Sequence, residues 1–314
     1  MRRVARDPTR AQLERPADGR ELTVRSADGT LLHAEQFGPE EGETVVLVHG
    51  WTENLSVWTH VIRELAADGS RVVALDLRGH GKSQPAREGD YSITRYGEDV
   101  QAALEQCLPG DRRALIAGHS LGAMSIVAWA EQADVGHRIK AAALINTGFG
   151  DLSTEHLLVP VPGLARTINK VVPAGRVLGA RGPLPRFSTP ISYAVIRYVA
   201  FGRAATPAQV AFYERMLAVC PPRARASTGV ALAELELHDA LAQLAVPTLV
   251  LAGEKDRLTP PSHARRVAEL LPDLHQLIVL EDTGHMAPLE RPREVCDALR
   301  ELTDRVRNPS AVAA

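Results

Sequence analysis

The stretch Ala114-Leu115-Ile116-Ala117-Gly118-His119-Ser120-Leu121-Gly122-Ala123-Met124 decides how this chain folds. A short apolar run that ends at a glycine is typical of a buried strand in a parallel sheet, and the residues after it favour a helix. Ser120 therefore lies on a sharp turn, where Gly118 and Gly122 provide the small neighbours that the turn needs. The pattern predicts an exposed nucleophile; for these five residues alone, a glycine-rich turn with an incidental serine is the alternative.

Length and composition indicate a globular protein without a nucleic-acid partner. The 314 residues allow one large α/β domain with an insertion, or two domains. A net charge of −2 and an aromatic content of 4% provide neither a basic field nor stacking platforms for bases. No apolar run reaches the roughly 18 residues that span a bilayer, so we expect no stable membrane insertion.

The cysteines and the chain ends show no pattern typical of a metal site, a disulfide framework or a secretory signal. Cys107, Cys220 and Cys296 are far apart and lack ligand spacing, so we expect no metal, no disulfide framework and a cytoplasmic location. The basic N-terminus has no apolar segment of a secretory signal. We expect a flexible arm over residues 1–20 and a frayed tail over 307–314. An arm that binds a partner in a homo-oligomer is the alternative.

Strand and helix patterns alternate through the first half of the chain. Two alternating runs flank the turn Asp28-Gly29 and predict a hairpin. The alternation after it predicts a parallel sheet with right-handed crossovers. The expected strands are 44–48, 71–75, 114–117 and 139–145, and the expected helices are 56–67, 94–107 and 121–132.

The alternation stops between residues 147 and 228 and then returns. Thr189-Pro190 and Thr206-Pro207 each place a capping hydroxyl before a proline, which is a helix start signal. The region therefore predicts a helical insertion, or cap, within a core formed by residues 21–146 and 229–306. The later core elements are strands 248–253 and 277–280 and helices 262–270 and 292–306.

Chemically capable residues follow several of these strands. Asp256 comes after strand 248–253, and His285 comes after strand 277–280. Parallel sheets place ligands at the carboxyl ends of their strands, where Ser120 also lies. A serine nucleophile needs a base, and the base needs a third group to orient it. Glu254, Asp282 or a residue after Ile145 are alternatives to Asp256 as that third group.

Four motifs together make the chain resemble the α/β-hydrolase superfamily from Glu21 to Val306. They are His49-Gly50-Trp51, the segment Asp76–Ser83, the Ser120 turn, and the endings Gly253–Asp256 and Gly284-His285. The order Ser, Asp, His also matches that superfamily. More weakly, residues 49–58 are similar to the cofactor-free haloperoxidase/esterase group. The resemblance implies a mostly parallel sheet flanked by helices, a cap, and no cofactor.

The resemblance also implies roles for individual residues. Ser120 would attack an acyl carbonyl, His285 would accept and then return its proton, and Asp256 would orient His285. The backbone N–H groups of Trp51 and Leu121 would form the oxyanion hole. Substrate would contact residues of the cap together with Trp51, Met124 and Met286.

The remaining polar residues near these motifs are expected to have structural roles. The side chain of His119 should point away from the substrate, and His49 should shape its loop. Asp76, Arg78 and His80 look catalytic in isolation, but in the superfamily this loop mainly braces the site.

These features predict a serine hydrolase that cleaves a small carboxylic ester or lactone through an acyl-enzyme. Perhydrolase or haloperoxidase activity, carbon–carbon bond hydrolysis and lipase activity at an interface are the enzymatic alternatives. A binding protein on the same fold is the non-enzymatic alternative. Epoxide hydrolases and haloalkane dehalogenases are disfavoured because they carry aspartate where this chain has Ser120.

Overall fold

A computed structural model describes residues 7–152, 179, 182 and 188–307 of the chain. Its centre is an eight-stranded sheet with the order β1-β2-β4-β3-β5-β6-β7-β8. β1 and β2 form the expected hairpin, β2 is antiparallel to β4, and the other pairs are parallel. The predicted α/β fold is confirmed. The strands are β1 Arg20–Arg25, β2 Leu31–Phe37, β3 Thr44–Val48, β4 Arg71–Leu75, β5 Ala114–His119, β6 Ile139–Ile145, β7 Thr248–Gly253 and β8 Leu274–Leu280.

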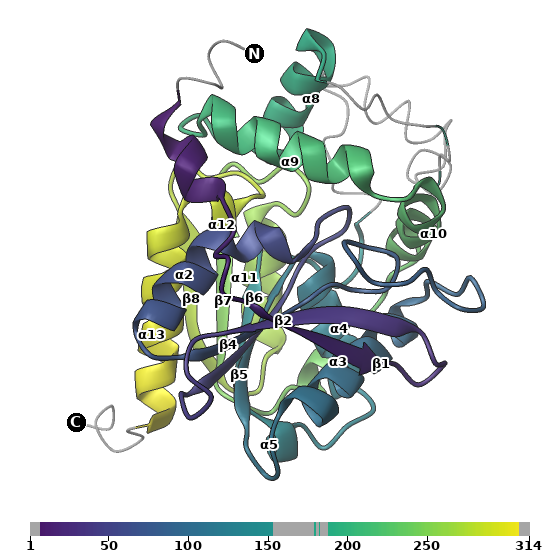
Figure 1. Ribbon diagram of the computed structural model, residues 1–314, viewed down its shortest axis with the longest axis vertical. Helices are drawn as coiled ribbons and strands as arrows, with labels where there is room; N and C mark the ends of the chain where they lie inside the picture. Colours follow the sequence, from purple (N-terminus) through teal and green to yellow (C-terminus); the bar gives the residue numbers. More distant parts are fainter. Residues whose placement is uncertain (1–6, 153–178, 180–181, 183–187, 308–314) are drawn as a thin grey trace.

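Helices cover both faces of the sheet (Figure 1). Because side chains alternate along a strand, Val46 and Val48 of β3 pack on one face and Val45 and Leu47 on the other. The first face packs against α3 Ile93–Cys107, α4 Leu121–Ala130 and α11 Pro261–Leu270, and the second packs against α2 Thr59–Ala67, α12 Ala287–Glu290 and α13 Pro292–Arg307. The short elements of the core are η2 Leu55–Trp58, α5 Val135–Arg138 and η3 Asp239–Gln243.

The turn between β5 and α4 is as tight as its glycines suggest. Ser120 has φ +50°, a value that L-residues rarely adopt. A Cβ on Gly122 would lie 2.2 Å from the carbonyl oxygen of Val48, and one on Gly118 would lie 2.4 Å from the amide of Ala123. The two glycines thus let α4 pack directly against the neighbouring backbone, which holds Ser120 at the strand end.

Three helices lie beyond the end of the sheet where Ser120 is located. They are α8 Pro190–Ala200, α9 Pro207–Val219 and α10 Pro222–Ala233. α8 and α9 form a layer at the top of Figure 1, and α10 descends beside it. Thr189 and Thr206 cap α8 and α9 through capping boxes. α10 continues five residues past the expected cap boundary at 228. Most of the first part of the expected cap, residues 153–187, lies outside the described residues.

The N-terminal arm differs from expectation where it is described. Pro8–Leu13 forms the short helix η1, and Asp7 caps it. Asp7 Oδ2 also accepts the N–H of Ala208 at 2.9 Å, and Leu13 is buried. A flexible arm over residues 1–20 is therefore wrong for this part, because the arm packs against α9 and α2. Residues 1–6 and the expected tail after Arg307 lie outside the described residues.

Two further expectations can be checked. Cys107, Cys220 and Cys296 are all free and buried, and burial raises their thiol pKa values to about 11, 12 and 12. None of the helices in the described part of the chain is long and apolar enough to cross a membrane.

Candidate active site

Ser120 lies at the carboxyl end of β5 and opens α4. Its N–H donates to the carbonyl of Ile145 at 2.9 Å, and its own carbonyl accepts the N–H groups of Ala123 and Met124. Thr147 Oγ1 donates to the same carbonyl at 3.1 Å. The backbone of Ser120 is therefore fixed on both sides, while the residue stays partly exposed.

Asp256 and His285 are in direct contact, as the strand ends predict. The distance from His285 Nδ1 to Asp256 Oδ2 is 2.8 Å. Asp256 is buried and also accepts the N–H groups of Leu258 and Thr259, each at 2.9 Å. Burial by itself would raise the pKa of Asp256, but His285 and the N–H of Thr259 help to hold it below its ordinary value. A carboxylate that stays ionised fixes a proton on Nδ1 and leaves Nε2 able to accept one.

The alternatives to Asp256 do not reach His285. Glu254 is exposed and pairs with Lys255, and Asp282 is exposed as well. Asn146, the residue after Ile145, instead donates its Nδ2 to Asp256 Oδ2 at 2.9 Å and to the carbonyl of Gly284 at 3.1 Å. It supports the pair as a hydrogen-bond donor, a role that sequence reasoning missed because it looked there for a carboxylate.

The two expected oxyanion donors occupy the expected loops. Trp51 follows β3, and Leu121 begins α4. Within the described residues, neither backbone N–H donates a hydrogen bond to the protein. Thr52, with φ +64°, uses its N–H to bind His80 Nε2 at 3.2 Å. The contribution of Trp51 and Leu121 to an oxyanion hole stays a prediction.

The loop after β4 braces the site, as the sequence analysis expects. Burial lowers the pKa of His80 to about 4, so the ring is neutral and accepts the N–H of Thr52. His49 is likewise buried with a lowered pKa, and its Nε2 accepts the N–H of Leu77 at 3.0 Å. Asp76 accepts the N–H of Leu55 at 2.7 Å. These groups position backbone rather than face substrate.

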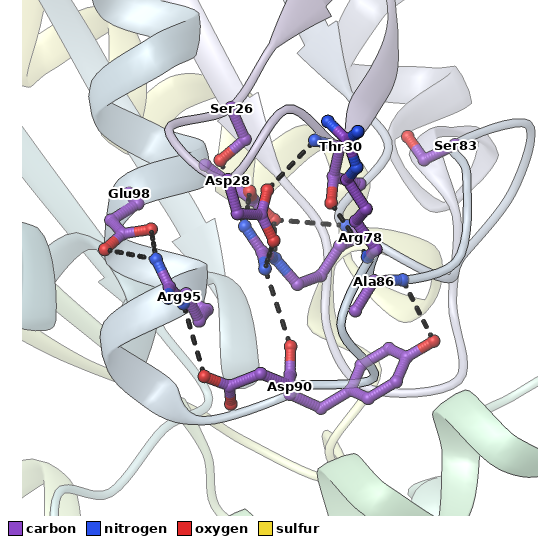
Figure 2. Close-up of polar contacts among 12 residues, drawn as sticks. Ser26, Asp28, Thr30, Arg78, Ser83, Ala86, Asp90, Arg95 and Glu98 are labelled. Carbon is purple, nitrogen blue, oxygen red and sulfur yellow. Dashed lines mark hydrogen bonds and ion pairs between the residues drawn. The ribbon is translucent and has the colours of Figure 1, made fainter.

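Arg78 also belongs to the loop after β4 and holds it through side-chain contacts to other segments (Figure 2). Its guanidinium binds Asp28 Oδ2 at 2.8 Å and Asp99 Oδ1 at 2.6 Å, and it also binds Ser26 Oγ at 3.0 Å. Arg78 and Asp99 are both fully buried. An arginine whose donors are committed to these partners has a structural role.

The three residues expected to bind substrate differ in their exposure. Trp51 is partly exposed, and its indole N–H donates to the carbonyl of Arg225 in α10 at 3.0 Å. Met124 and Met286 are buried in the two core clusters on opposite faces of the sheet. Both methionine side chains are almost completely buried in this structure, so their contact with substrate stays a prediction.

His119 and two glutamates, Glu53 and Glu290, complete the surroundings of His285. His119 is fully buried, and its Nε2 lies 2.8 Å from the carbonyl oxygen of His285; that its side chain points away from substrate stays a prediction. Glu53 pairs with His119, and Glu290 accepts the N–H of Gly284 at 3.0 Å. Sequence reasoning missed both glutamates because no motif spacing connects them to His285.

One acidic cluster could hold a metal by distance alone. Ligand atoms of Glu21, His33 and Glu35 lie within 4.8 Å of one another. Arg15 pairs with Glu35 at 2.6 Å, and Lys82 pairs with Glu21. Because two cationic side chains already neutralise the carboxylates, the cluster is an ion-pair network and gives no argument for a metal.

Comparisons with known proteins agree with this architecture. A family model described as the alpha/beta hydrolase fold matches residues 43–292. The AB hydrolase superfamily protein YisY of Bacillus subtilis is 24% identical over 284 residues, which cover 90% of this chain and 98% of the relative. The bifunctional esterase/perhydrolase DCH of Acinetobacter calcoaceticus is 26% identical over 252 residues, covering 76% and 83%. A solved thermophilic esterase from Thermogutta terrifontis superimposes with a TM-score of 0.72 at 25% identity, covering 91% and 99%. The chain therefore belongs to the α/β-hydrolase family and is an enzyme of the hydrolase class.

Proposed function

We propose that this enzyme hydrolyses a small carboxylic ester or lactone through an acyl-enzyme formed on Ser120. The observation that carries the proposal is the buried contact of 2.8 Å between His285 Nδ1 and Asp256 Oδ2. It orients an imidazole whose Nε2 is placed to take a proton from a hydroxyl group. In the described structure Ser120 makes no hydrogen bond to His285, so their contact is part of the proposal.

Acylation begins when Ser120 Oγ attacks the carbonyl carbon while its proton moves to His285 Nε2. The carbonyl oxygen gains negative charge, which the N–H groups of Trp51 and Leu121 stabilise. The bond from carbon to the leaving oxygen then breaks, and His285 returns the proton to that oxygen. A water molecule repeats the sequence on the acyl-enzyme, with His285 as base, and releases the acid and free Ser120.

A second acceptor for the acyl group is supported by one relative. The Acinetobacter protein is named as an esterase and perhydrolase. Hydrogen peroxide in place of water at the second step would give a peroxy acid from the same acyl-enzyme.

Three free buried thiols also support a reducing compartment such as the cytoplasm.

A panel of chromogenic esters and lactones of graded size, with a fluorophosphonate probe, tests the proposal. We expect hydrolysis of at least one class, and covalent labelling at Ser120 that Ser120→Ala abolishes. Ser120→Ala should keep the fold and lower kcat by at least about a thousandfold. Folded wild-type protein that neither turns over the panel nor labels at Ser120 would exclude an acyl-enzyme.

A further inference from the structure

A buried ion pair connects two of the loops that the proposed reaction uses. Glu53, in the loop after β3, lies with its carboxylate oxygens 3.0 and 3.1 Å from His119 Nδ1. Both side chains are almost completely buried. The pair lies between the turn of Ser120, the loop of Trp51 and the loop of His285.

Each end of this pair holds backbone of a different loop. Glu53 Oε2 accepts the N–H of Gly50 at 2.7 Å, next to Trp51. His119 Nε2 lies 2.8 Å from the carbonyl oxygen of His285, and the two imidazole rings are 4.9 Å apart. A continuous chain of contacts thus runs from Gly50 through Glu53 and His119 to His285.

The partners fix where the protons are. A carbonyl oxygen only accepts hydrogen bonds, so His119 Nε2 must carry a proton. An ionised Glu53 also only accepts, so His119 Nδ1 carries the second proton. Glu53 raises the pKa of His119 against the opposing effect of burial, and His119 lowers the pKa of Glu53 in return. Both pKa directions favour the pair in which His119 keeps two protons and Glu53 is ionised, with His285, Asp256 and His49 as the other titratable groups near His119.

Stability alone gives a poor reason for such a pair. Taking two charges out of water carries a large desolvation penalty for each ion, and apolar residues of the same volume commonly stabilise a core at least as well. The Arg78–Asp99 pair is equally buried but binds neither the Trp51 loop nor the His285 loop. What distinguishes Glu53 and His119 is the backbone that they hold.

We propose that Glu53 and His119 are positioning residues that fix the separation between the oxyanion loop and His285. The inference rests on the proposed function, since it concerns the geometry of that reaction. A transition state needs the oxyanion donors and the base on the same carbonyl, and a shift of about 1 Å can cost on the order of a hundredfold in rate. Substrate binding before the reaction does not need this alignment.

Four variants separate positioning from simple stabilisation. Glu53→Ala and His119→Asn each break the chain of contacts, the first at Gly50 and the second at His285. We expect each to lower kcat about ten- to hundredfold, with KM within about threefold of wild type. The double variant should be no worse than either single one, because both cut one chain. Glu53→Gln can accept from Gly50 and donate to a neutral His119, so it should keep kcat within about threefold.

Asp99→Asn is the matched control, because it removes the charge of an equally buried carboxylate. It should lower the melting temperature and, at temperatures where the protein is folded, lower kcat by less than either Glu53→Ala or His119→Asn does, because Asp99 contacts neither the Trp51 loop nor the His285 loop directly. A folded Glu53→Ala or His119→Asn enzyme with kcat within about twofold of wild type would overturn the proposal. Additive losses in the double variant, or losses confined to KM, would overturn it as well.

One measurement on unmodified protein is independent of activity. In protein labelled with ¹⁵N-histidine, we expect both ring nitrogens of His119 to be protonated at neutral pH. A single proton on His119 would overturn the ion pair, whether or not variants fold. If wild-type enzyme fails the ester panel, the proposed function fails, and this spectrum still decides the state of His119.

Discussion

The backbone N–H of His285 donates to the carbonyl of Ala200, at 2.8 Å, so the last turn of α8 is hydrogen-bonded to the loop of the candidate base. A helix of the cap is therefore bound to the candidate base through the backbone. This contact does not depend on which side chains of the cap face substrate. Glu290 strengthens the junction by accepting N–H groups from Gly202, beside α8, and from Gly284.

Gly202→Ala tests this junction. A Cβ on Gly202 would lie 1.9 Å from the carbonyl oxygen of Asp282, so the cap must move away from the His285 loop. We expect kcat to fall at least about tenfold while the sheet stays folded, measured by steady-state kinetics and far-ultraviolet circular dichroism. Gly136→Ala is the matched control, because a Cβ there meets only Asp134 Oδ1 at 3.8 Å. Equal kcat values for the two variants would show that the contact between the cap and the His285 loop does not affect turnover.

Asp256→Asn should lower kcat by about a thousandfold or more with the fold intact. An amide cannot stabilise the imidazolium that forms during the reaction, and it does not enforce a proton on His285 Nδ1. Glu254→Gln and Asp282→Asn are controls, since both side chains are exposed and should be dispensable. Turnover that survives in Asp256→Asn but is lost in either control would reassign the orienting acid.

Glu290 should make stability depend on pH. Burial raises the pKa of Glu290 to about 7, above its unfolded value of 4.5, so the folded state keeps a proton that the unfolded state has lost. Between about pH 4.5 and 7 the free energy of unfolding therefore falls as pH rises, by up to about 3 kcal/mol from this group. Glu290→Gln does not titrate, so the advantage of wild type over the variant should shrink between pH 5 and pH 8. Urea unfolding at both values measures it, and parallel curves would contradict the assignment.

Tyr213→Phe tests the contact between α9 and the oxyanion loop. Tyr213 Oη lies 3.2 Å from Thr52 Oγ1, and Thr52 Oγ1 donates to the carbonyl of Trp51 at 2.6 Å. Losing the hydroxyl should cost about 1 kcal/mol of stability, and kcat should fall a few-fold because Thr52 holds a strained φ beside Trp51. Thermal unfolding and kinetics measure the two effects. Tyr96→Phe, which removes a buried hydroxyl bound to Thr228, should change stability alone.

Much of the fold could be predicted because its signals are local. The apolar runs that end at Val48, Leu75 and Ile145 coincide with strands of the structure. Strand β8 begins at Leu274, three residues earlier than expected, because its first residues mix polar and apolar side chains. In the arm, Asp7 before Pro8 is a local helix start signal, and it coincides with the beginning of η1.

The site was predictable only in the part that strand ends determine. Asp256 and His285 follow neighbouring parallel strands, so their contact follows from topology. The partner of His119 is 66 residues away in the sequence, and Glu290 reaches Gly202 from 88 residues away. Such pairs depend on how loops and cap pack against one another, which no periodicity encodes.

The contacts of the cap also affect how this enzyme could be re-engineered. Ala200 in α8 is bound to His285, and Tyr213 in α9 and Arg225 in α10 are bound to the loop of Trp51 and Thr52. A chimera that exchanged the whole cap with that of a relative would replace the residues that we expect to contact substrate and the supports of the reacting groups together. Grafts that begin after Gly202 and retain the Tyr213 hydroxyl and the turn of α10 at Arg225 should change selectivity with the least loss of turnover.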